Sequence, residues 1–460
     1  MKKWKTWTAC MVFLSILCSA CSESFLDEKA DAGIGTPYQL SDYRAMMDNA
    51  VVMNFKASYA LGIFGGDELN LQSNIWETAR EIWLKNAYIW ADDVFEGTGS
   101  EDWNTAYTRI LYTNLVLEGL DRISLTEHET AEWNRIRGAA LFFRGLNYFQ
   151  LAQLFMPVYN VEVMEKKLGL PIRLSSDVNV PSERSTVRQT YDQILKDLEN
   201  AVELLPEKEI TTMRPSKAGC YGVLARIYLQ LSEYEKAARY ASKALDIQNG
   251  LIDYNDLAPK SDFSFESDWG AGNKEILFLN YMNAYTLLTK ARMNVANELL
   301  DLYQEIDLRK KIFYKTGTNK NIYFCGSYMG SGQFFVGPTT AEMYLIRAET
   351  NARSGNIKLA LEDINHLRKY RLDKSLFVQV EITDEENLLR FILNERMREL
   401  AFRGQRWEDL RRLNKDPRFV KKIFRTLNDK IFSLEPNASK YVWPIADDVV
   451  NRSGIKQNDR

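Results

Sequence analysis

Histidine is scarce in this sequence, and neither sign of charge dominates. Only His128 and His366 occur among 460 residues, so few combinations remain for a histidine-ligated metal centre or a histidine-based catalytic triad. The 59 basic and 62 acidic side chains leave a formal net charge of −3, whereas nucleic-acid binding proteins need a basic field that attracts phosphates. We therefore expect no nucleic-acid partner. The scarcity of histidine also argues against an enzyme that depends on histidine chemistry.

Common catalytic motifs are missing as well. The sequence contains no Walker A loop, no GxSxG nucleophile elbow and no HExxH, the arrangements that would indicate nucleotide, acyl-transfer or zinc-protease chemistry. Two aspartate pairs, at 92–93 and 447–448, lie outside any EF-hand spacing and are typical of solvated or helix-capping residues. We expect a protein that is not an enzyme and that has no metal site and no cofactor.

Long hydrophobic runs are confined to the N-terminus. Lysines at positions 2, 3 and 5 precede an apolar run of 14 residues, Trp7–Ala20, which is too short for a membrane-spanning helix of ~20 residues but suits a secretory leader. The run closes with small residues before Cys21, which resembles a lipobox, although leucine is commoner than cysteine at position 18. We predict a lipoprotein signal peptide over 1–20, acylation of Cys21 (with palmitate among its chains) and attachment to a membrane. The alternative is ordinary cleavage after Ala20, which would leave a free thiol.

Residues 21–40 have the polar, Gly/Pro-containing composition of an extended tether. Because the leader carries three lysines and no acidic residue, the chain that follows it has a formal net charge of −6. Beyond Cys21 only Cys220 and Cys325 remain. They could form one disulfide, but two cysteines make no disulfide framework, so two buried free thiols are the favoured interpretation.

From residue 41 to 460 the sequence predicts a mainly α-helical domain. Apolar residues recur at spacings of three and four, the pattern of a helix with one buried face. The predicted helices are Asp102–Ile123, Trp133–Phe155, Thr190–Leu205, Ser216–Leu231, Tyr234–Asp246, Thr339–Ser354, Ile357–Tyr370 and Glu385–Phe402. The second of these is apolar on two sides and should be deeply buried.

Some of these helices have tetratricopeptide (TPR) spacing, with bulky residues on one helix facing small residues on the next. One pair spans 221–244, a second combines Tyr344 and Ala348 with Ala360, and a third is split, with Gly145 and Tyr148 on one helix and residues 201–206 closing the other. We expect TPR-like pairs around 137–246 and 339–414, with 156–190 as an insertion. Any amphipathic helical hairpin can give such matches by chance, so this interpretation remains open for the last two pairs.

Aromatic-rich loop regions, at 60–100 and 250–338, separate the helical blocks. Within the second region, Glu275–Tyr281 and Gly332–Val336 have the composition of short strands. A helical scaffold that carries long aromatic loops is typical of binding proteins, because rigid elements hold the loops that recognise a ligand.

These loops also contain candidate ligand-binding residues. Sugar rings stack on exposed aromatic side chains while their hydroxyls bond to short polar side chains, so a sugar site needs both kinds together. The candidates are Asp67, Asn70, Trp76 and Trp90 in the first region, and Trp269, Tyr281 and Tyr285 in the second. Trp83 is seven residues from Trp76, a helical spacing that favours a packing role.

The stretch ERMRELAFRGQRWEDLRR (395–412) is highly charged, which could indicate a functional site, but a structural role is the favoured interpretation. Its acidic and basic residues can form a salt-bridged corner between two helices. Charge networks without a pocket rarely indicate catalysis. The residues we assign to this corner are Glu395, Arg396, Glu399, Arg406 and Asp409.

Several segments, spread over nearly the whole chain, occur in a familiar order. They are CSESFLD (21–27), RGAALFFRGLNYFQLAQLF (137–155), RSTVRQTYDQILKDLENAVELLP (184–206), RPSKAGCYGVLARIYL (214–229), ILNERMRELAFRGQRWEDLRRLN (392–414), Trp443-Pro444-Ile445 and Gln457-Asn458. Together they resemble the SusD/RagB family of outer-membrane nutrient-binding lipoproteins of Bacteroidetes. The segment 392–414 is the most specific. The usual glycine after Phe155 is Met156 here, which we expect to affect only the end of the helix.

The resemblance implies a SusD-like fold on the cell surface, attached to the outer membrane. It also implies a partner, a SusC-like TonB-dependent transporter over which the lipoprotein acts as a lid. Family members bind oligosaccharides in most characterised branches and oligopeptides in the RagB-like branch, and the aromatic loops favour an oligosaccharide here. An oligopeptide-binding lipoprotein, a TPR-like scaffold without its own ligand and a surface glycoside hydrolase stay open as alternatives.

Overall fold

Helices form most of the regular structure of the computed structural model, which describes residues 37–258, 262–268 and 270–460. The predicted signal peptide, Cys21, most of the tether and Trp269 lie outside the described residues. The first helices are α2 (Leu40–Asp48), α3 (Ala50–Met53), α4 (Ala60–Gly65), α5 (Ser73–Glu77), α6 (Ile82–Tyr88), α7 (Glu101–Leu120), α8 (Thr130–Phe155) and α9 (Val187–Leu204). The remaining helices are α10 (Lys217–Gln230), α11 (Tyr234–Ile247), α12 (Asn297–Leu300), α13 (Arg309–Phe313), α14 (Thr340–Arg353), α15 (Ile357–Lys369), α16 (Glu385–Glu399), α17 (Arg406–Leu413) and α18 (Asp447–Ser453). Over this part of the chain, no helix is both long and apolar enough to cross a membrane.

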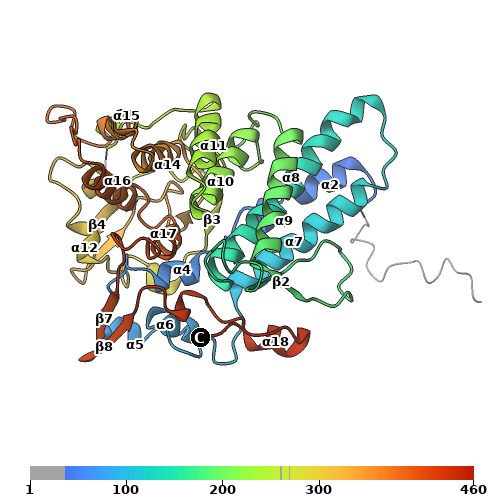
Figure 1. The fold of residues 1–460 in the computed structure, drawn as a ribbon, viewed down its shortest axis with the longest axis horizontal. Coiled ribbons are helices and arrows are strands. Elements are labelled where there is room, and N and C mark those ends of the chain that lie inside the picture. The colour runs from blue at the N-terminus through green and yellow to red at the C-terminus, as the bar shows by residue number, and fades with distance from the viewer. Residues whose placement is uncertain (1–36, 259–261, 269) are drawn as a thin grey trace, which may run out of the picture.

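The strands are short and form four antiparallel pairs. They are β1 (Leu168–Pro171) with β2 (Arg184–Thr186), β3 (Tyr281–Met282) with β6 (Phe334–Phe335), β4 (Tyr314–Thr316) with β5 (Ile322–Phe324), and β7 (Ile423–Leu427) with β8 (Lys430–Leu434). The β7–β8 hairpin projects from the edge of the molecule at the lower left of Figure 1. The fold is therefore mainly α-helical with a few short strands, as the sequence predicts.

The three predicted TPR-like pairs are packed helix pairs: α8 with α9, α10 with α11, and α14 with α15. They follow one another across the molecule, from α7–α9 at the right through α10 and α11 to α14–α16 at the left (Figure 1). Helix α11 also packs on α14, which joins the second pair to the third. The helical pairs therefore form one continuous scaffold.

Two of these pairs turn in the same way. Three residues separate α10 from α11 and α14 from α15, and the central residue of each turn is left-handed: Ser232 has φ 61° and Gly355 has φ 73°. A left-handed residue after a helix ends its hydrogen-bond ladder and reverses the chain. The first helix of each pair also begins in the same way, because the side-chain oxygens of Ser216 and Thr339 cap α10 and α14 by accepting a backbone N–H.

The α8–α9 pair depends on a glycine. A Cβ at Gly145 would lie 2.8 Å from Cγ of Leu198 and 3.2 Å from the carbonyl oxygen of Ile194 on α9, so the two helices approach too closely for a side chain there. All residues from Gly138 to Phe155 on α8 are buried, as its sequence predicts. The insertion between the two helices contains the β1–β2 pair.

The two predicted strand segments pair with each other, but over two residues only. Tyr281 lies opposite Phe335 and Met282 lies opposite Phe334. The preceding residues of the first segment bond to separate partners instead: Leu277 donates its N–H to the carbonyl of Pro338 at 3.1 Å. The prediction of Glu275–Tyr281 as a strand is thus correct only at its end.

Buried ion pairs fix the loop region 250–338 to the helices. Arg371 donates to Glu275 and to Glu399 of α16, both at 2.8 Å, and Arg309 donates to Glu399 at 2.9 Å and to Glu395 at 2.5 Å. All five side chains are at most 1% exposed. The predicted structural role of Glu395 and Glu399 is therefore confirmed, and the corner extends into the core.

The two cysteines of the described region, Cys220 and Cys325, are free and buried, which confirms the favoured interpretation. Burial raises the pKa of both thiols, so each stays protonated and unreactive. Neither thiol takes part in the candidate site described below.

Candidate ligand-binding site

The two aromatic-rich loop regions predicted from the sequence, 60–100 and 250–338, contact each other in the structure. Leu69 and Val295 form an antiparallel bridge. Asn70 donates its backbone N–H to the carbonyl of Asn294 at 2.8 Å, and the amide of Asn294 donates back to the carbonyl of Asn70 at 3.0 Å. Residues more than 200 positions apart thus form one surface, near α5 and α6 at the bottom of Figure 1.

An aromatic patch lies where these loops join, and we define it by Trp83, Tyr285, Asn283, Glu101 and Lys56. The rings of Trp83 and Tyr285 meet edge to face, with centroids 5.5 Å apart and planes at 85°. Glu101 accepts hydrogen bonds from the hydroxyl of Tyr285 at 3.0 Å and from the amide of Asn283 at 2.9 Å, and Lys56 lies 3.3 Å from it. Both rings are half-buried. The patch therefore offers aromatic surface with charged and amide groups at its rim, the chemistry that a sugar ring requires.

Trp76 lies on α5, next to the helix that carries Trp83. Its indole N–H donates to the carbonyl of Lys85 on α6 at 3.0 Å, and the ammonium of Lys85 sits 5.2 Å from its ring centroid. The two tryptophans were expected to share one helical face, but residues 78–81 separate α5 from α6. Trp83, for which the spacing favoured a packing role, packs on Phe64 with centroids 6.3 Å apart and keeps part of its surface exposed.

Two predicted binding residues are structural in this arrangement. Asp67 is 7% exposed, and its carboxylate accepts two bonds of 2.7 Å from Arg406 and a third from Lys421 at 2.7 Å. Burial opposes its ionisation, but these cations outweigh it and hold the pKa of Asp67 below its usual range. Trp90 is 1% exposed, donates its indole N–H to Gly65 and lies under the guanidinium of Arg425. Neither side chain presents a surface to a ligand.

Of the other predicted binding residues, some lie on the surface and one is buried. Asn70 is exposed beside the junction of the two loops, and Tyr285 belongs to the aromatic patch. Tyr281 is 2% exposed, with its ring 4.2 Å from that of Phe55. Trp269 lies outside the described residues, so its predicted role stays a prediction. Asn70, Trp76 and Tyr285 are the predicted residues that the structure places on the surface.

Sequence reasoning missed Glu101 and Lys56. Glu101 is the first residue of α7, where a carboxylate favours the helix N-terminus, and that local role gives no sign of its bonds to Asn283 and Tyr285, more than 180 residues away. Burial raises the pKa of Tyr285 well above its usual value. Its hydroxyl therefore stays a hydrogen-bond donor to Glu101.

Comparison with known proteins defines first the fold and then the family. A solved SusD superfamily protein from Bacteroides thetaiotaomicron superimposes with a TM-score of 0.75 at 23% identity, covering 92% of this chain and 100% of that one. A putative sugar binding protein from Bacteroides vulgatus gives a TM-score of 0.72 at 22% identity over 92% of this chain and 99% of that one. These similarities show that the chain shares the fold of these two proteins.

The sequence matches lead to the same family. Residues 24–229 match the family described as "Starch-binding associating with outer membrane", and residues 340–459 match the SusD family. SusD-like protein P2 of Formosa agariphila is 25% identical over 389 residues, 71% of this chain and 74% of that protein. The chain belongs to the SusD/RagB family.

Proposed function

We propose that this protein is a lipid-anchored, surface-exposed lipoprotein of the outer membrane that binds an oligosaccharide at the aromatic patch. The observation that carries the proposal is the partly buried pair of Trp83 and Tyr285, rimmed by Asn283 and Glu101 where the two loop regions join. Aromatic faces and short polar side chains are the two components of a sugar site. Family membership and the name of the Bacteroides vulgatus neighbour, a putative sugar binding protein, support this ligand class.

The bound oligosaccharide is delivered to a SusC-like TonB-dependent transporter in this proposal. Its support is the family: the matching family is described as associating with the outer membrane. The small residues before Cys21 supply the predicted site of acylation, and several acyl chains give durable attachment. The ligand surface and the anchor thus belong to different parts of the chain.

Binding without catalysis is the second part of the proposal. Hydrolysis of a glycosidic bond uses two carboxyl groups on either side of the bond. Asp102, the acid next to Glu101, is 3% exposed and accepts the N–H of Leu61 at 2.9 Å. It therefore faces the core. Glu101 is the acidic residue among those that define the aromatic patch, and the carboxylate of Glu81 beside it is bonded to the hydroxyl of Thr286 at 2.6 Å.

Calorimetric titration of the purified protein against neutral plant and host polysaccharides and a mixed peptide pool tests the proposal. We expect one polysaccharide to bind wild type and Trp83→Ala to weaken that binding by about five- to thirtyfold, since stacking on an aromatic ring contributes about 1–2 kcal/mol. Trp133→Ala is the matched control, because Trp133 is half-buried on α8, where its indole donates to Leu120.

Binding that both tryptophan variants weaken equally would count against the aromatic patch. Binding of peptides alone would move the ligand to the RagB-like class. Release of reducing ends from a bound polysaccharide would contradict the non-catalytic part of the proposal.

A further inference from the structure

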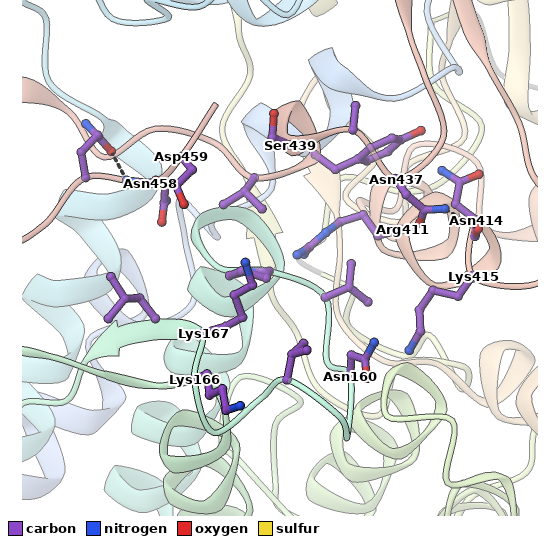
Figure 2. Close-up of a pocket in the computed structure, with 18 of the residues that line it drawn as sticks. Asn160, Lys166, Lys167, Arg411, Asn414, Lys415, Asn437, Ser439, Asn458 and Asp459 are labelled. Atoms are coloured by element: carbon purple, nitrogen blue, oxygen red, sulfur yellow. Dashed lines mark hydrogen bonds between the residues drawn. The ribbon is translucent and has the colours of Figure 1, made fainter.

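A cavity of about 1040 Å³ lies on a different part of the molecule from the aromatic patch. Its walls are the segment 157–168 after α8, the end of α17 with the residues that follow, the segment 437–442 and residues 456–459 near the C-terminus (Figure 2). None of the residues that define the aromatic patch lines it. Its volume is at the upper end of the range for small-ligand sites, so it has room for an oligomer.

Basic side chains far outnumber acidic ones in the lining of this cavity. They are Lys166, Lys167, Arg184, Arg411, Lys415 and Lys456, against a single carboxylate, Asp459. In the part of the chain that the structure describes, none of these six cations has an ion-pair partner within 4.0 Å. Lys415 donates to the carbonyl of Tyr159 at 2.7 Å, and Arg184 donates to carbonyls. In a protein with more acidic than basic residues, this lining forms a positive region that its one carboxylate, Asp459, offsets only in part.

Arg411 supplies a buried charge in this positive region. It is 3% exposed; its two terminal nitrogens donate to the carbonyls of Gln153 and Met156, and its Nε is buried without a partner. Burial lowers its pKa to about 10, so it stays charged at neutral pH. Figure 2 shows Lys167 and Arg411 extending toward one another across the cavity. An anion between them would relieve their repulsion and satisfy the charge of a guanidinium held away from water.

The rest of the lining suits a sugar. Asn160, Asn437 and Ser439 contribute amide and hydroxyl groups, and Val163, Val420 and Tyr441 contribute apolar surface. We infer that this cavity is a second ligand site, which binds an acidic oligosaccharide through its carboxylate or sulfate groups. The repeated anionic groups contact the lysines and Arg411, while the ring hydroxyls bond to the amides.

Titration of the purified full-length protein with oligosaccharides of matched length and different charge tests this inference. The probes are tetragalacturonate, a sulfated tetrasaccharide, neutral maltotetraose and the peptide tetraglutamate. We expect at least one acidic saccharide to bind more tightly than maltotetraose and tetraglutamate, with an affinity that falls as salt rises. The carboxylated and sulfated probes distinguish the two sources of negative charge.

A double variant, Lys166→Glu with Lys167→Glu, assigns the binding to the cavity. Both lysines are exposed, so we expect the fold to tolerate the change and the affinity for the acidic saccharide to fall about tenfold or more. Lys358→Glu with Lys374→Glu is the control of equal charge, because both lysines are exposed and neither lines the cavity. Trp83→Ala should leave this binding unchanged, which separates the cavity from the proposed function of the aromatic patch.

Three results would overturn the inference: no binding of either acidic saccharide at millimolar concentration, equal loss of affinity in both double variants, or tighter binding of tetraglutamate than of either acidic saccharide. The last result would replace the saccharide with an acidic peptide.

Discussion

The helical pairs and the loop region 250–338 differ in how far they depend on buried charge. Helix α8 packs on α9 through apolar contacts, the close approach that Gly145 permits and one buried ion pair, in which Arg144 donates to Asp197 at 2.7 and 2.8 Å. The loop region depends on a larger buried network of arginines and glutamates, with Arg371 at its centre, shared by Glu275 and Glu399. Apolar packing tolerates small adjustments, whereas a buried ion pair that loses one partner leaves an uncompensated charge. The loops that carry Tyr285 therefore depend on a few distant charged residues.

Removing the central arginine should have the largest effect. Arg371→Met leaves Glu275 and Glu399 without one of their cations in the core, and we expect a loss of about 3–5 kcal/mol in the free energy of unfolding. Guanidinium unfolding followed by tryptophan fluorescence measures it. The matched control is Arg390→Met on α16, whose partner Glu386 is half-exposed. A similar loss in both variants would contradict the distinction between buried and exposed charges.

A side chain at the α8–α9 contact should have the next largest effect. Gly145→Ala places a Cβ 2.8 Å from Cγ of Leu198, and we expect the overpacking to cost about 1–2 kcal/mol after the higher helix propensity of alanine is included. The same unfolding experiment detects it. Gly332→Ala serves as the comparison, since its Cβ would meet nothing nearer than 3.9 Å. An unchanged midpoint for Gly145→Ala would show that the two helices can separate freely.

Two buried glutamates should respond to pH in opposite ways. Burial raises the pKa of Glu408 to about 8, and both its oxygens lack hydrogen-bond partners. Folded Glu408 thus keeps its proton between about pH 4.5 and 8 while the unfolded chain releases it, so this residue reduces stability as pH rises. We expect Glu408→Gln to match wild type at pH 5 and to unfold at a higher temperature at pH 8, with a gain of about 1–3 kcal/mol.

Glu349 provides the opposite case. Burial opposes its ionisation, but Arg412 and Arg353 outweigh this and lower its pKa to about 2. Its contribution to stability is therefore present above about pH 4.5 and lost as pH falls toward 2. Glu349→Gln should destabilise the protein at both pH 5 and pH 8, and a thermal midpoint that changes equally with pH in both variants would rule out this account of the charged core.

The smallest effect should come from an exposed pair. Lys358 and Glu362 on α15 lie 4.0 Å apart with Lys358 90% exposed, and such pairs contribute little. Lys358→Ala should leave the thermal midpoint unchanged within error. A marked shift of the thermal midpoint would show that exposed ion pairs also contribute substantially to the stability of this fold.

Much of the helical scaffold could be predicted from the sequence. The predicted ends of the longer helices agree with the structure to within three residues, because amphipathic periodicity and capping are local properties. The pairing of α8 with α9 was predicted across an insertion, since Gly145 marks a close approach. Local pattern therefore sufficed for this part of the chain.

The candidate site was less predictable, because its residues depend on partners far along the chain. Asp67 resembles a loop carboxylate until Arg406, 339 residues later, pairs with it. Trp90 resembles an exposed loop aromatic until Arg425 covers it. Local composition located the correct loops, but the long-range contacts decide which side chains stay on the surface.

Hydrogen–deuterium exchange with and without the bound polysaccharide tests the central claim most directly. The account predicts that the ligand slows exchange in residues 76–88 and 281–286, around the aromatic patch, while the helical pairs α10–α11 and α14–α15 stay unchanged. Slower exchange confined to those helical pairs, with none near Trp83 and Tyr285, would contradict it.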